Sequence, residues 1–449
     1  MIVMKFGGTS VGNAAAIRKV VHAVLRSQSE SPIVVVSALS KVTDALLALE
    51  AMATAGDVAG LDEAVQALER RHDEVAEELS VLPQVEDALA GQFQELRDLV
   101  GRRLGRRFTP ADRDQLLAMG ELLSSRLVTA ALAAARLPAE WFDARLVIRT
   151  DDRFGGAIPA MPILRTNARD YLLPLVQGGA IAVTQGFIGR TADGRTTTLG
   201  RGGSDFTAAL LGAALQVDRV EIWTDVDGLM TADPRIVPSA HLVTRATYDE
   251  AAELSAFGAK VLHPATQLPL VEAGIPIQIR NTFAPETAGT WISADHGAGD
   301  HGTVRSISFK RGVTVVQIKA PRMLGAFGFL RQIFEVFERH EIVVDVLATS
   351  EVSVSLTVDD ARRMEAAAAE LRTIGEVWLH AGRGVVAVVG SAIRETAGIA
   401  GRVYSAVSDV NIEMISQGAS ATNLTFVVRE EDGAKVVREL HREFFGEAT

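Results

Sequence analysis

Thr197-Thr198-Leu199-Gly200-Arg201-Gly202-Gly203-Ser204-Asp205 runs directly into an apolar helical pattern over residues 206–215, and the rest of the chain is organised around this stretch. Its glycines let the backbone approach a ligand closely, and Ser204 or Asp205 can cap the helix that follows. Free N–H groups at a helix start favour a phosphate or carboxylate, and Arg201 adds a planar cation suited to the same groups. The stretch predicts a turn that binds an anion; a capped glycine turn without a ligand is the alternative.

Strand patterns recur on both sides of this turn, at residues 1–6, 33–37, 144–149, 180–184, 219–224 and 276–280. Helical patterns lie between them, and the longest helical region covers residues 57–137. This alternation predicts an α/β fold, a three-layer sandwich with a mainly parallel central sheet and helices on both faces. Ligands of such folds gather at the carboxyl ends of the strands, where glycine turns follow Phe6, Thr184 and Leu199.

A polar, glycine-rich segment precedes a tail that repeats itself. We expect a first domain over 1–290 and a linker over 291–303. The tail then reads β-α-β-β-α-β twice, in the manner of ferredoxin-like modules, but the second copy lacks its last strand. Because a spare strand at 304–310 can supply it, we expect the first module (313–383) to be inserted within the second, which comprises 304–312 and 384–449.

Two local expectations concern the first of these modules. Residues 342–349 have the pattern of a single strand. Phe327, Leu330, Phe334 and Phe337 recur at helical spacing and predict one face of a helix.

Composition narrows the possible functions. The chain has 449 residues, enough for about three domains at roughly 150 residues each, and no apolar run reaches the ~18 residues of a membrane span. Its start reads as a strand rather than a signal peptide, so we expect a cytoplasmic protein that binds no membrane. The absence of cysteine excludes disulfides and thiolate chemistry, and a net charge of −11 argues against nucleic acid. His296 and His301 lack partners at a metal-binding spacing, so no metal-ligating residues are predicted.

Phosphate-binding motifs of the commonest kinds, such as G-x-x-x-x-G-K-[ST], are absent, so a nucleotide needs another design. Five other segments occur in order: residues 5–10, 184–189, 197–205, 223–225 and 257–264. Together they closely resemble the aspartate kinase branch of the amino-acid kinase superfamily, and the tail resembles the paired ACT domains of these enzymes. Trp141-Phe142-Asp143 and Thr349-Ser350-Glu351-Val352 make the monofunctional, lysine-sensitive type the most similar.

The resemblance implies transfer of a phosphoryl group from ATP, with Mg²⁺, to the side-chain carboxylate of L-aspartate. It also implies L-lysine as effector and a homodimer formed through the ACT domains, or a tetramer. An aspartate carboxylate, with a pKa near ~3.9, is already ionised at neutral pH, so the protein has to position groups and neutralise charge. Two alternatives stay open: another small-molecule kinase of the superfamily, and a catalytically silent amino-acid sensor.

The resemblance also assigns residues. Catalytic roles fall on Lys5, Asp205 and Lys260. The implied aspartate-binding positions are Thr43, Glu121, Phe187, Arg201, Gly202 and Ser204, with Arg201 on the α-carboxylate and Glu121 on the α-ammonium. The implied nucleotide-binding positions are Gly7, Gly8, Thr224, Asp225, Met230, Arg235 and Lys260, with Mg²⁺ held mostly by phosphate oxygens. The implied effector positions are Met323, Gly328, Leu330, Val344, Asp345, Thr349, Ser350 and Glu351. A solvated Glu121, and an Arg235 that only caps the turn at Asp233, are the alternatives.

Overall fold

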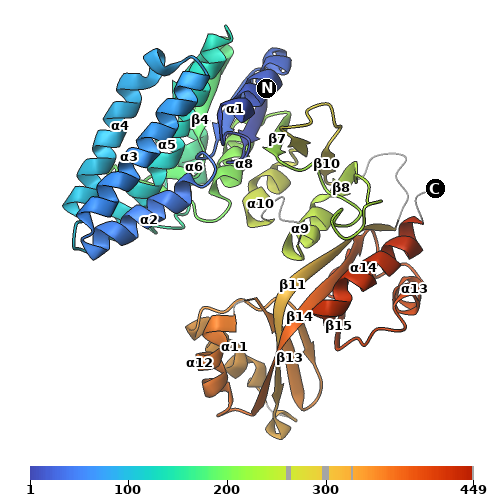
Figure 1. The fold of residues 1–449 in the computed structure, drawn as a ribbon. Helices are drawn as coiled ribbons and strands as arrows, with labels where there is room; N and C mark the ends of the chain where they lie inside the picture. The colour runs from blue at the N-terminus through green and yellow to red at the C-terminus, as the bar shows by residue number, and fades with distance from the viewer. Residues whose placement is uncertain (259–263, 296–302, 325–326, 360, 447–449) are drawn as a thin grey trace. The chain divides into compact units, whose positions relative to one another are not determined.

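The computed structural model describes residues 1–258, 264–295, 303–324, 327–359 and 361–446. By packing, the chain forms two compact units (Figure 1). The first comprises Met1–Leu229 and Val261–His296, and the second comprises Met230–Lys260 and Gly297–Thr449. The domain boundaries expected at 290 and 303 stay a prediction.

The first unit is built on a mainly parallel sheet. Its strands are β1 (Ile2–Phe6), β2 (Pro32–Val36), β3 (Ala139–Phe142), β4 (Ile181–Gln185), β7 (Arg219–Thr224), β9 (Ile277–Asn281) and β10 (Thr290–Ser293). They lie in the order β3-β4-β2-β1-β7-β9-β10, and β10 is antiparallel to β9. Phe6 at the end of β1 lies opposite Val36 of β2 and Trp223 of β7, so these strand ends share one edge. The expected parallel α/β architecture is confirmed.

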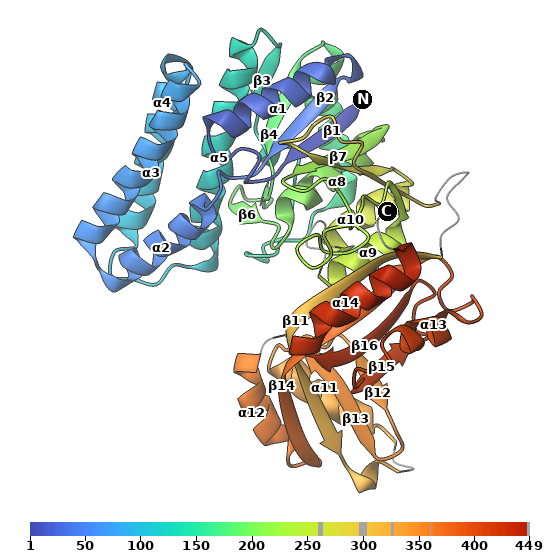
Figure 2. The same cartoon turned by 45° about the vertical axis from the view of Figure 1, so that its right-hand side comes forward.

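The helices of the first unit pack on this sheet or on one another. They are α1 (Ala14–Arg26), α2 (Val42–Ala55), α3 (Val58–Glu78), α4 (Leu82–Arg102), α5 (Pro110–Ala134), α6 (Met161–Asn167), α7 (Leu173–Gln177), α8 (Gly203–Leu215) and α10 (Pro264–Ala273). Figures 1 and 2 show α2 to α5 side by side as the helical layer expected from residues 57–137. Helix α5 is long and apolar enough to cross a membrane by length and composition, but 78% of that window is buried inside the structure.

One strand of the first unit was misplaced by the sequence pattern. The strand expected at 144–149 lies instead at Ala139–Phe142, and Ala144–Leu146 forms a 3-10 turn. The Asp143 side chain accepts a hydrogen bond from the Arg145 backbone N–H at 2.9 Å, which stabilises the turn and ends the strand before it. A small hairpin of β5 (Ile188–Arg190) and β6 (Thr196–Thr198) leads into the glycine stretch.

The second unit contains an antiparallel sheet in the order β12-β13-β11-β14-β16-β15. Its strands are β11 (Val304–Lys319), β12 (Leu347–Thr349), β13 (Ser353–Val358), β14 (Glu376–Gly390), β15 (Met414–Gln417) and β16 (Asn423–Arg429). The spare strand at 304–310 pairs with 385–390, as Lys310 opposite Val385 illustrates. However, 304–310 and 313–319 form one continuous strand, because the backbone passes between them through a register shift rather than a break.

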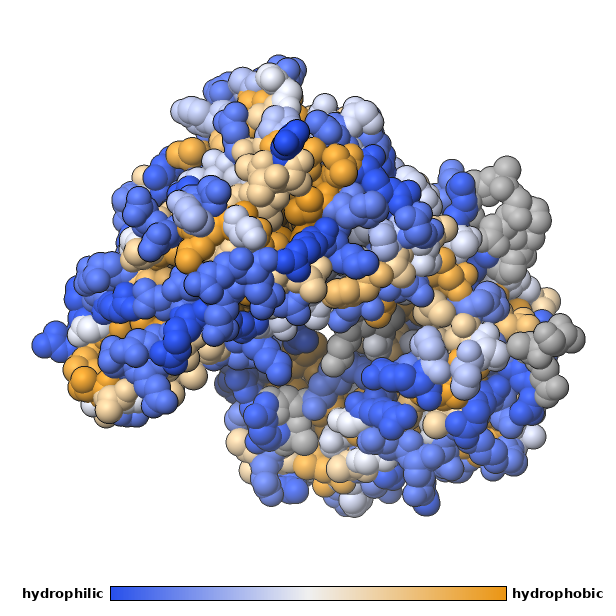
Figure 3. All heavy atoms as spheres, turned by 45° about the horizontal axis from the view of Figure 1, so that its top comes forward, coloured by the Kyte–Doolittle hydropathy of each residue, from blue (hydrophilic) through white to orange (hydrophobic). Residues whose placement is uncertain are grey.

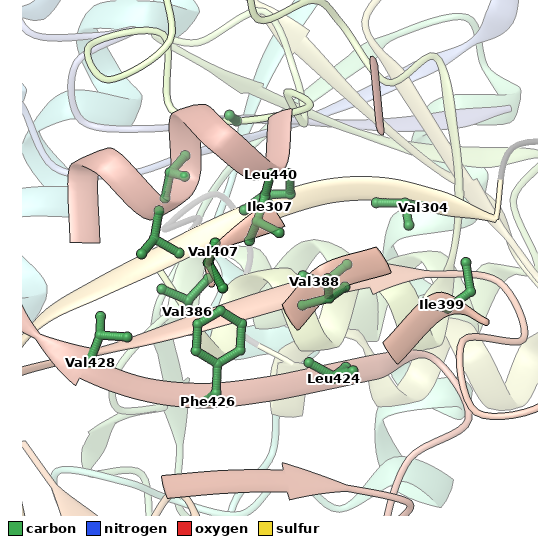
Figure 4. Close-up of a cluster of buried hydrophobic side chains, with 14 of the residues drawn as sticks. Val304, Ile307, Val386, Val388, Ile399, Val407, Leu424, Phe426, Val428 and Leu440 are labelled. Atoms are coloured by element: carbon green, nitrogen blue, oxygen red, sulfur yellow. The ribbon is translucent and has the colours of Figure 1, made fainter. Parts of the chain in front are cut away.

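The helices of the second unit are α9 (Tyr248–Ala256), α11 (Phe329–Arg339), α12 (Ala361–Leu371), α13 (Ile399–Ala406) and α14 (Glu430–Phe445), and β8 (Arg245–Thr247) precedes α9. One core lies between the sheet and helices α13 and α14, where Phe426, Val386 and Leu440 meet (Figure 4). Ala232 and Val237 join this core, so residues that follow β7 in sequence pack with the tail.

The core of the other module corrects two expectations. Phe329, Ile333, Val336 and Phe337 form the buried face of α11, whereas Phe327 is fully exposed (100%). Leu330 and Phe334 are also exposed, so the expected face lies mostly toward solvent rather than on the core. The strand expected over 342–349 is limited to Leu347–Thr349, which pair with β13 in regular register. Asp345 and Val346 also exchange backbone hydrogen bonds with Thr357 of β13, but outside that register. The surface of the molecule on the side shown in Figure 3 is mainly hydrophilic, with scattered apolar patches.

Candidate active site

Lys5 and Asp205 form an ion pair at the carboxyl end of β1. Lys5 lies on a strand whose other side chains are buried, and its Nζ is 2.6 Å from Asp205 Oδ1 in the first turn of α8. The two side chains are only 11% and 16% exposed. A lysine removed from water needs a partner, and the carboxylate of Asp205 supplies one. The pair therefore fixes a cation at a strand end, where α/β proteins bind ligands.

The glycine stretch bends sharply before α8. Gly200 and Gly202 have φ angles of 77° and 72°, in the left-handed region that residues with a Cβ rarely adopt. The expectation that Ser204 or Asp205 caps the helix is wrong, because the N-cap is Gly202 and no side chain caps the helix start. The turn thus begins a 13-residue helix whose first N–H groups have no side-chain cap, as anion binding requires.

A pocket of about 380 Å³ lies above this turn. All of the expected aspartate-binding positions line it, together with Lys5, Gly8 and Asp205 of the catalytic and nucleotide sets. The residues of this lining that were expected are Lys5, Gly8, Thr43, Glu121, Phe187, Arg201, Gly202, Ser204 and Asp205. The fold therefore brings residues that are 200 positions apart in sequence to one cavity.

Glu121 is buried in this pocket, so the solvated alternative is wrong. The residue lies on α5, is 5% exposed, and its Oε1 accepts a hydrogen bond from the Ala38 backbone N–H at 3.1 Å. Its Oε2 is buried and has no hydrogen-bond partner within the described ranges. Burial raises the pKa of Glu121 to about 8, while the Ala38 N–H and the charge of Lys5 act in the opposite direction. A cationic ligand beside Oε2 would favour the carboxylate and satisfy this atom.

Arg201 has the opposite character. Its side chain is exposed at the pocket lining, and no ion pair to it occurs in the part of the chain that the structure describes. An exposed guanidinium next to a pocket can bind a carboxylate through two parallel hydrogen bonds. Arg201 and Glu121 together offer the pocket one cation and one anion.

The loop between β2 and α2 was missed by sequence reasoning, although Thr43 in the first turn of α2 was expected. Ser37, Ala38, Leu39, Ser40 and Lys41 all line the pocket. The available signal was their position: they follow the carboxyl end of a fully buried parallel strand, next to β1.

The expected nucleotide positions divide between the two units. Thr224 ends β7 and Asp225 follows it, on the strand beside β1, and the Gly7 backbone N–H donates to Trp223 O at 3.1 Å. Met230 and Arg235 belong to the second unit, and Lys260 lies outside the described residues. Arg235 pairs with Asp233 at 2.7 Å, as its alternative assumes. The nucleotide role of all these residues stays a prediction.

The expected effector positions lie around the start of α11 in the second unit. Met323 ends a 3-10 turn, Gly328 precedes α11 with a φ of 76°, and Leu330 is in its first turn. Val344 packs against the module core, and Asp345 is ion-paired. Thr349 ends β12, and Ser350 and exposed Glu351 form the tight turn to β13, where the Ser350 N–H donates to Ser353 O at 2.8 Å. No grouping of three His, Asp or Glu able to hold a metal occurs among the described residues.

Comparisons with known proteins place this architecture. A model of the amino acid kinase family matches residues 1–281, and one of the ACT domain matches residues 386–444. The lysine-sensitive aspartokinase 3 of Escherichia coli K12 is 37% identical over 453 residues, covering 99% of each chain.

Two crystal structures of E. coli aspartokinase III each have a TM-score of 0.85 to this chain and cover 99% of it. The complex with aspartate and ADP (R-state) is 37% identical and is covered over 100% of its length. The complex with lysine and aspartate (T-state) is 36% identical and is covered over 99%. With this identity along its whole length, the chain belongs to the aspartokinases, amino-acid kinases that carry an ACT region after the kinase domain.

Proposed function

We propose that this aspartokinase transfers a phosphoryl group from ATP to the side-chain carboxylate of L-aspartate, giving 4-phospho-L-aspartate. The observation that carries the proposal is that Lys5, Asp205, Glu121 and Arg201 line the same pocket. A buried carboxylate with an unpartnered oxygen and an exposed guanidinium complement the α-ammonium and α-carboxylate of an amino acid. The structure of the E. coli relative with aspartate and ADP supports aspartate as the acceptor here, and ATP, from which ADP is formed, as the donor.

Catalysis in this proposal depends on position and charge. The attacking carboxylate, with a pKa of about 3.9, is ionised at neutral pH, so no residue has to remove a proton. Lys5 neutralises charge on the phosphoryl group as it leaves the nucleotide, and Asp205 holds the Lys5 ammonium at 2.6 Å. Mg²⁺, held mainly by the phosphate oxygens of ATP, would supply additional positive charge.

We place the nucleotide along the adjacent ends of β1 and β7. Gly7, Gly8, Thr224 and Asp225 follow these two parallel strands at one edge of the sheet. Met230, Arg235 and Lys260 belong to the same proposal through the family resemblance alone. For Arg235 this requires exchange of its Asp233 contact for a phosphate, and a raised ATP KM in Arg235→Ala is the result that would support it.

An acceptor panel separates this function from its alternatives. ADP release should be measured with aspartate, glutamate and N-acetylglutamate at saturating Mg²⁺ and ATP. We expect release with aspartate and little with the other two acids. N-acetylglutamate has no α-ammonium for Glu121, and the extra methylene of glutamate displaces its side-chain carboxylate relative to Lys5 when Glu121 and Arg201 hold the α-groups. Preference for another acceptor would indicate a different small-molecule kinase, and no release with any acid would indicate a silent sensor.

We propose that L-lysine regulates the enzyme at the expected effector positions of the second unit. The E. coli relative with lysine and aspartate supports the effector, and Asp345 supplies a carboxylate for an ammonium. Initial rates with lysine, threonine and methionine test this, together with an Asp345→Ala variant. Inhibition by lysine that is lost in Asp345→Ala supports the site, whereas inhibition unchanged in that variant removes Asp345 from it.

We also propose that the second unit forms a homodimer, from which a tetramer could assemble. Leu324, Phe327, Leu330, Phe334 and Val343 are exposed apolar side chains on or next to α11 in the same module. Such a cluster favours burial against a symmetric copy. Light scattering of the wild type and of Phe327→Ser tests this. The wild type should have at least the mass of a dimer, and the variant should be monomeric at protein concentrations at which the wild type is still associated. A monomeric wild type would overturn the assignment.

A further inference from the structure

The ion pair at Asp345 involves three charged side chains rather than two. Lys310 Nζ lies 2.7 Å from Asp345 Oδ2 and 2.7 Å from Asp359 Oδ2. The three come from separate parts of the second unit: Lys310 is in β11, Asp345 lies in the segment before β12, and Asp359 directly follows β13. Their side chains are 18%, 22% and 55% exposed, respectively. One ammonium is therefore shared by two carboxylates, of which only Asp359 is well solvated.

The chemical identity of this ammonium matters, because Asp345 is the carboxylate proposed to bind the effector. The side chain of Lys310 ends in the same group as free L-lysine, so it occupies Asp345 as an amino-acid ammonium would. We infer that Lys310 is an intramolecular competitor, whose ammonium must leave Asp345 before an effector ammonium can bind there. This inference rests on the proposed regulation by lysine and names the residue that sets its concentration range.

Asp359 gives the displaced ammonium a place to go. The group of three has a net charge of −1, so a second cation is electrostatically favoured beside it. When an effector takes Asp345, Lys310 can keep its contact with Asp359, which lies nearer to solvent. The lysine side chain at position 310 suits this exchange, because its ammonium is a compact charge on a flexible chain, whereas an arginine would have a rigid, planar donor group. Burial and the neighbouring Asp359 raise the pKa of Asp345, which agrees with a carboxylate that benefits from a cation at all times.

Competition predicts effects of opposite sign for the two partners. In Lys310→Met, Asp345 is free of its internal cation, and half-maximal inhibition should need about three- to tenfold less lysine. In Asp359→Asn, the displaced ammonium has lost its second carboxylate and stays on Asp345, so more lysine should be needed. Lys310→Arg keeps a cation that can bind both carboxylates. Half-maximal inhibition of this variant should therefore require at least as much lysine as inhibition of the wild type.

The experiment measures lysine inhibition of aspartate phosphorylation and, by calorimetry, lysine binding to the full chain. Lys435→Met is the matched control. Lys435, in α14, forms another Lys–Asp ion pair in the same unit, and its partner is Asp409. This control should leave the lysine response unchanged. Thermal unfolding of each variant reports whether it is folded. If Lys310→Met does not fold, Asp359→Asn still tests the inference.

The outcomes distinguish the two levels of the proposal. A wild type that neither binds lysine nor is inhibited by it means that the proposed regulation is wrong. If the wild type responds but Lys310→Met needs the same or more lysine, the regulation stands and the competitor role is overturned. Tighter lysine binding in Asp359→Asn overturns the competitor role as well.

Discussion

The most informative substitution in the active site is Glu121→Gln. Glutamine keeps the size of the side chain and an oxygen that can accept the Ala38 N–H, which now bonds Glu121 Oε1 at 3.1 Å. It replaces the buried atom that lacks a partner, Oε2, with an uncharged NH2 group, which donates hydrogen bonds and cannot accept one from an ammonium. If this atom binds the α-ammonium of aspartate, the variant should lose affinity for aspartate but not for ATP.

The magnitude follows from the pKa of Glu121, which burial raises to about 8. At that pKa the free enzyme carries the carboxylate in about a tenth of the molecules at pH 7 and in about half at pH 8. Because the apparent affinity scales with the competent fraction, the KM for aspartate should fall about fivefold from pH 7 to pH 8. Loss of a hydrogen bond between charged groups, about 1.5–3 kcal/mol, should raise the KM of the Gln variant about 10- to 150-fold at pH 8.

The assay is a set of initial rates against aspartate concentration from pH 6.5 to 8.5, at saturating ATP, for both proteins. The sign of the effect is fixed: wild-type affinity must rise with pH, since the deprotonated form binds the ammonium. Glu121→Gln should show no such rise, and the KM for ATP is the internal control. A wild-type KM for aspartate that is constant from pH 7 to 8, or a Gln variant with the same slope, would refute the reasoning.

Three further predictions concern the same pocket. Lys5→Met should lower kcat about 10²- to 10³-fold with smaller changes in both KM values, because the Lys5 cation acts mainly on charge that develops in the transition state; single-turnover kinetics would measure it. Arg201→Ala should raise the KM for aspartate at least about tenfold and change the KM for ATP little, and equal effects on both would remove Arg201 from the aspartate site. Gly186→Ala places a Cβ 2.5 Å from Ser204 Cβ and 2.8 Å from Ser204 Cα, so it should lower both thermal stability, by about 1–3 kcal/mol, and kcat/KM for aspartate. Gly91→Ala, where the added Cβ meets nothing within 4 Å, is the control and should not reduce stability.

Much of the site could be predicted because several of its residues lie at the ends of strands or in the turns that follow them. Lys5 is a charged residue on a strand that is otherwise buried, and Gly200 and Gly202 adopt backbone angles that few other residues tolerate. Such positions allow few residue types, so the sequence there carries a strong signal. Glu121 was identified through the resemblance alone, because one acidic residue on a helix does not reveal that α5 is buried on nearly all sides.

What could not be predicted depends on tertiary packing. Phe327, Leu330 and Phe334 have the spacing of a buried face. The module core is filled instead by Phe329, Ile333 and Phe337, which form the buried face of α11. Periodicity shows that a helix has apolar stripes but not which stripe meets the sheet. Likewise, no local pattern shows that Lys310 reaches both Asp345 and Asp359, since these residues are 35 and 49 positions away and meet only through sheet pairing.

The central claim is that the carboxylate of the aspartate side chain receives the phosphoryl group. The direct measurement uses ATP labelled at the γ-phosphate together with hydroxylamine, which attacks the acyl phosphate, forms a hydroxamate and releases the transferred phosphate. Mass spectrometry then determines which carboxylate of aspartate carries the hydroxamate. The account predicts the hydroxamate of the side-chain carboxylate, formed with wild type and depleted strongly in Lys5→Met. A hydroxamate on the α-carboxylate, or label released as free phosphate with no trapped product, would contradict it.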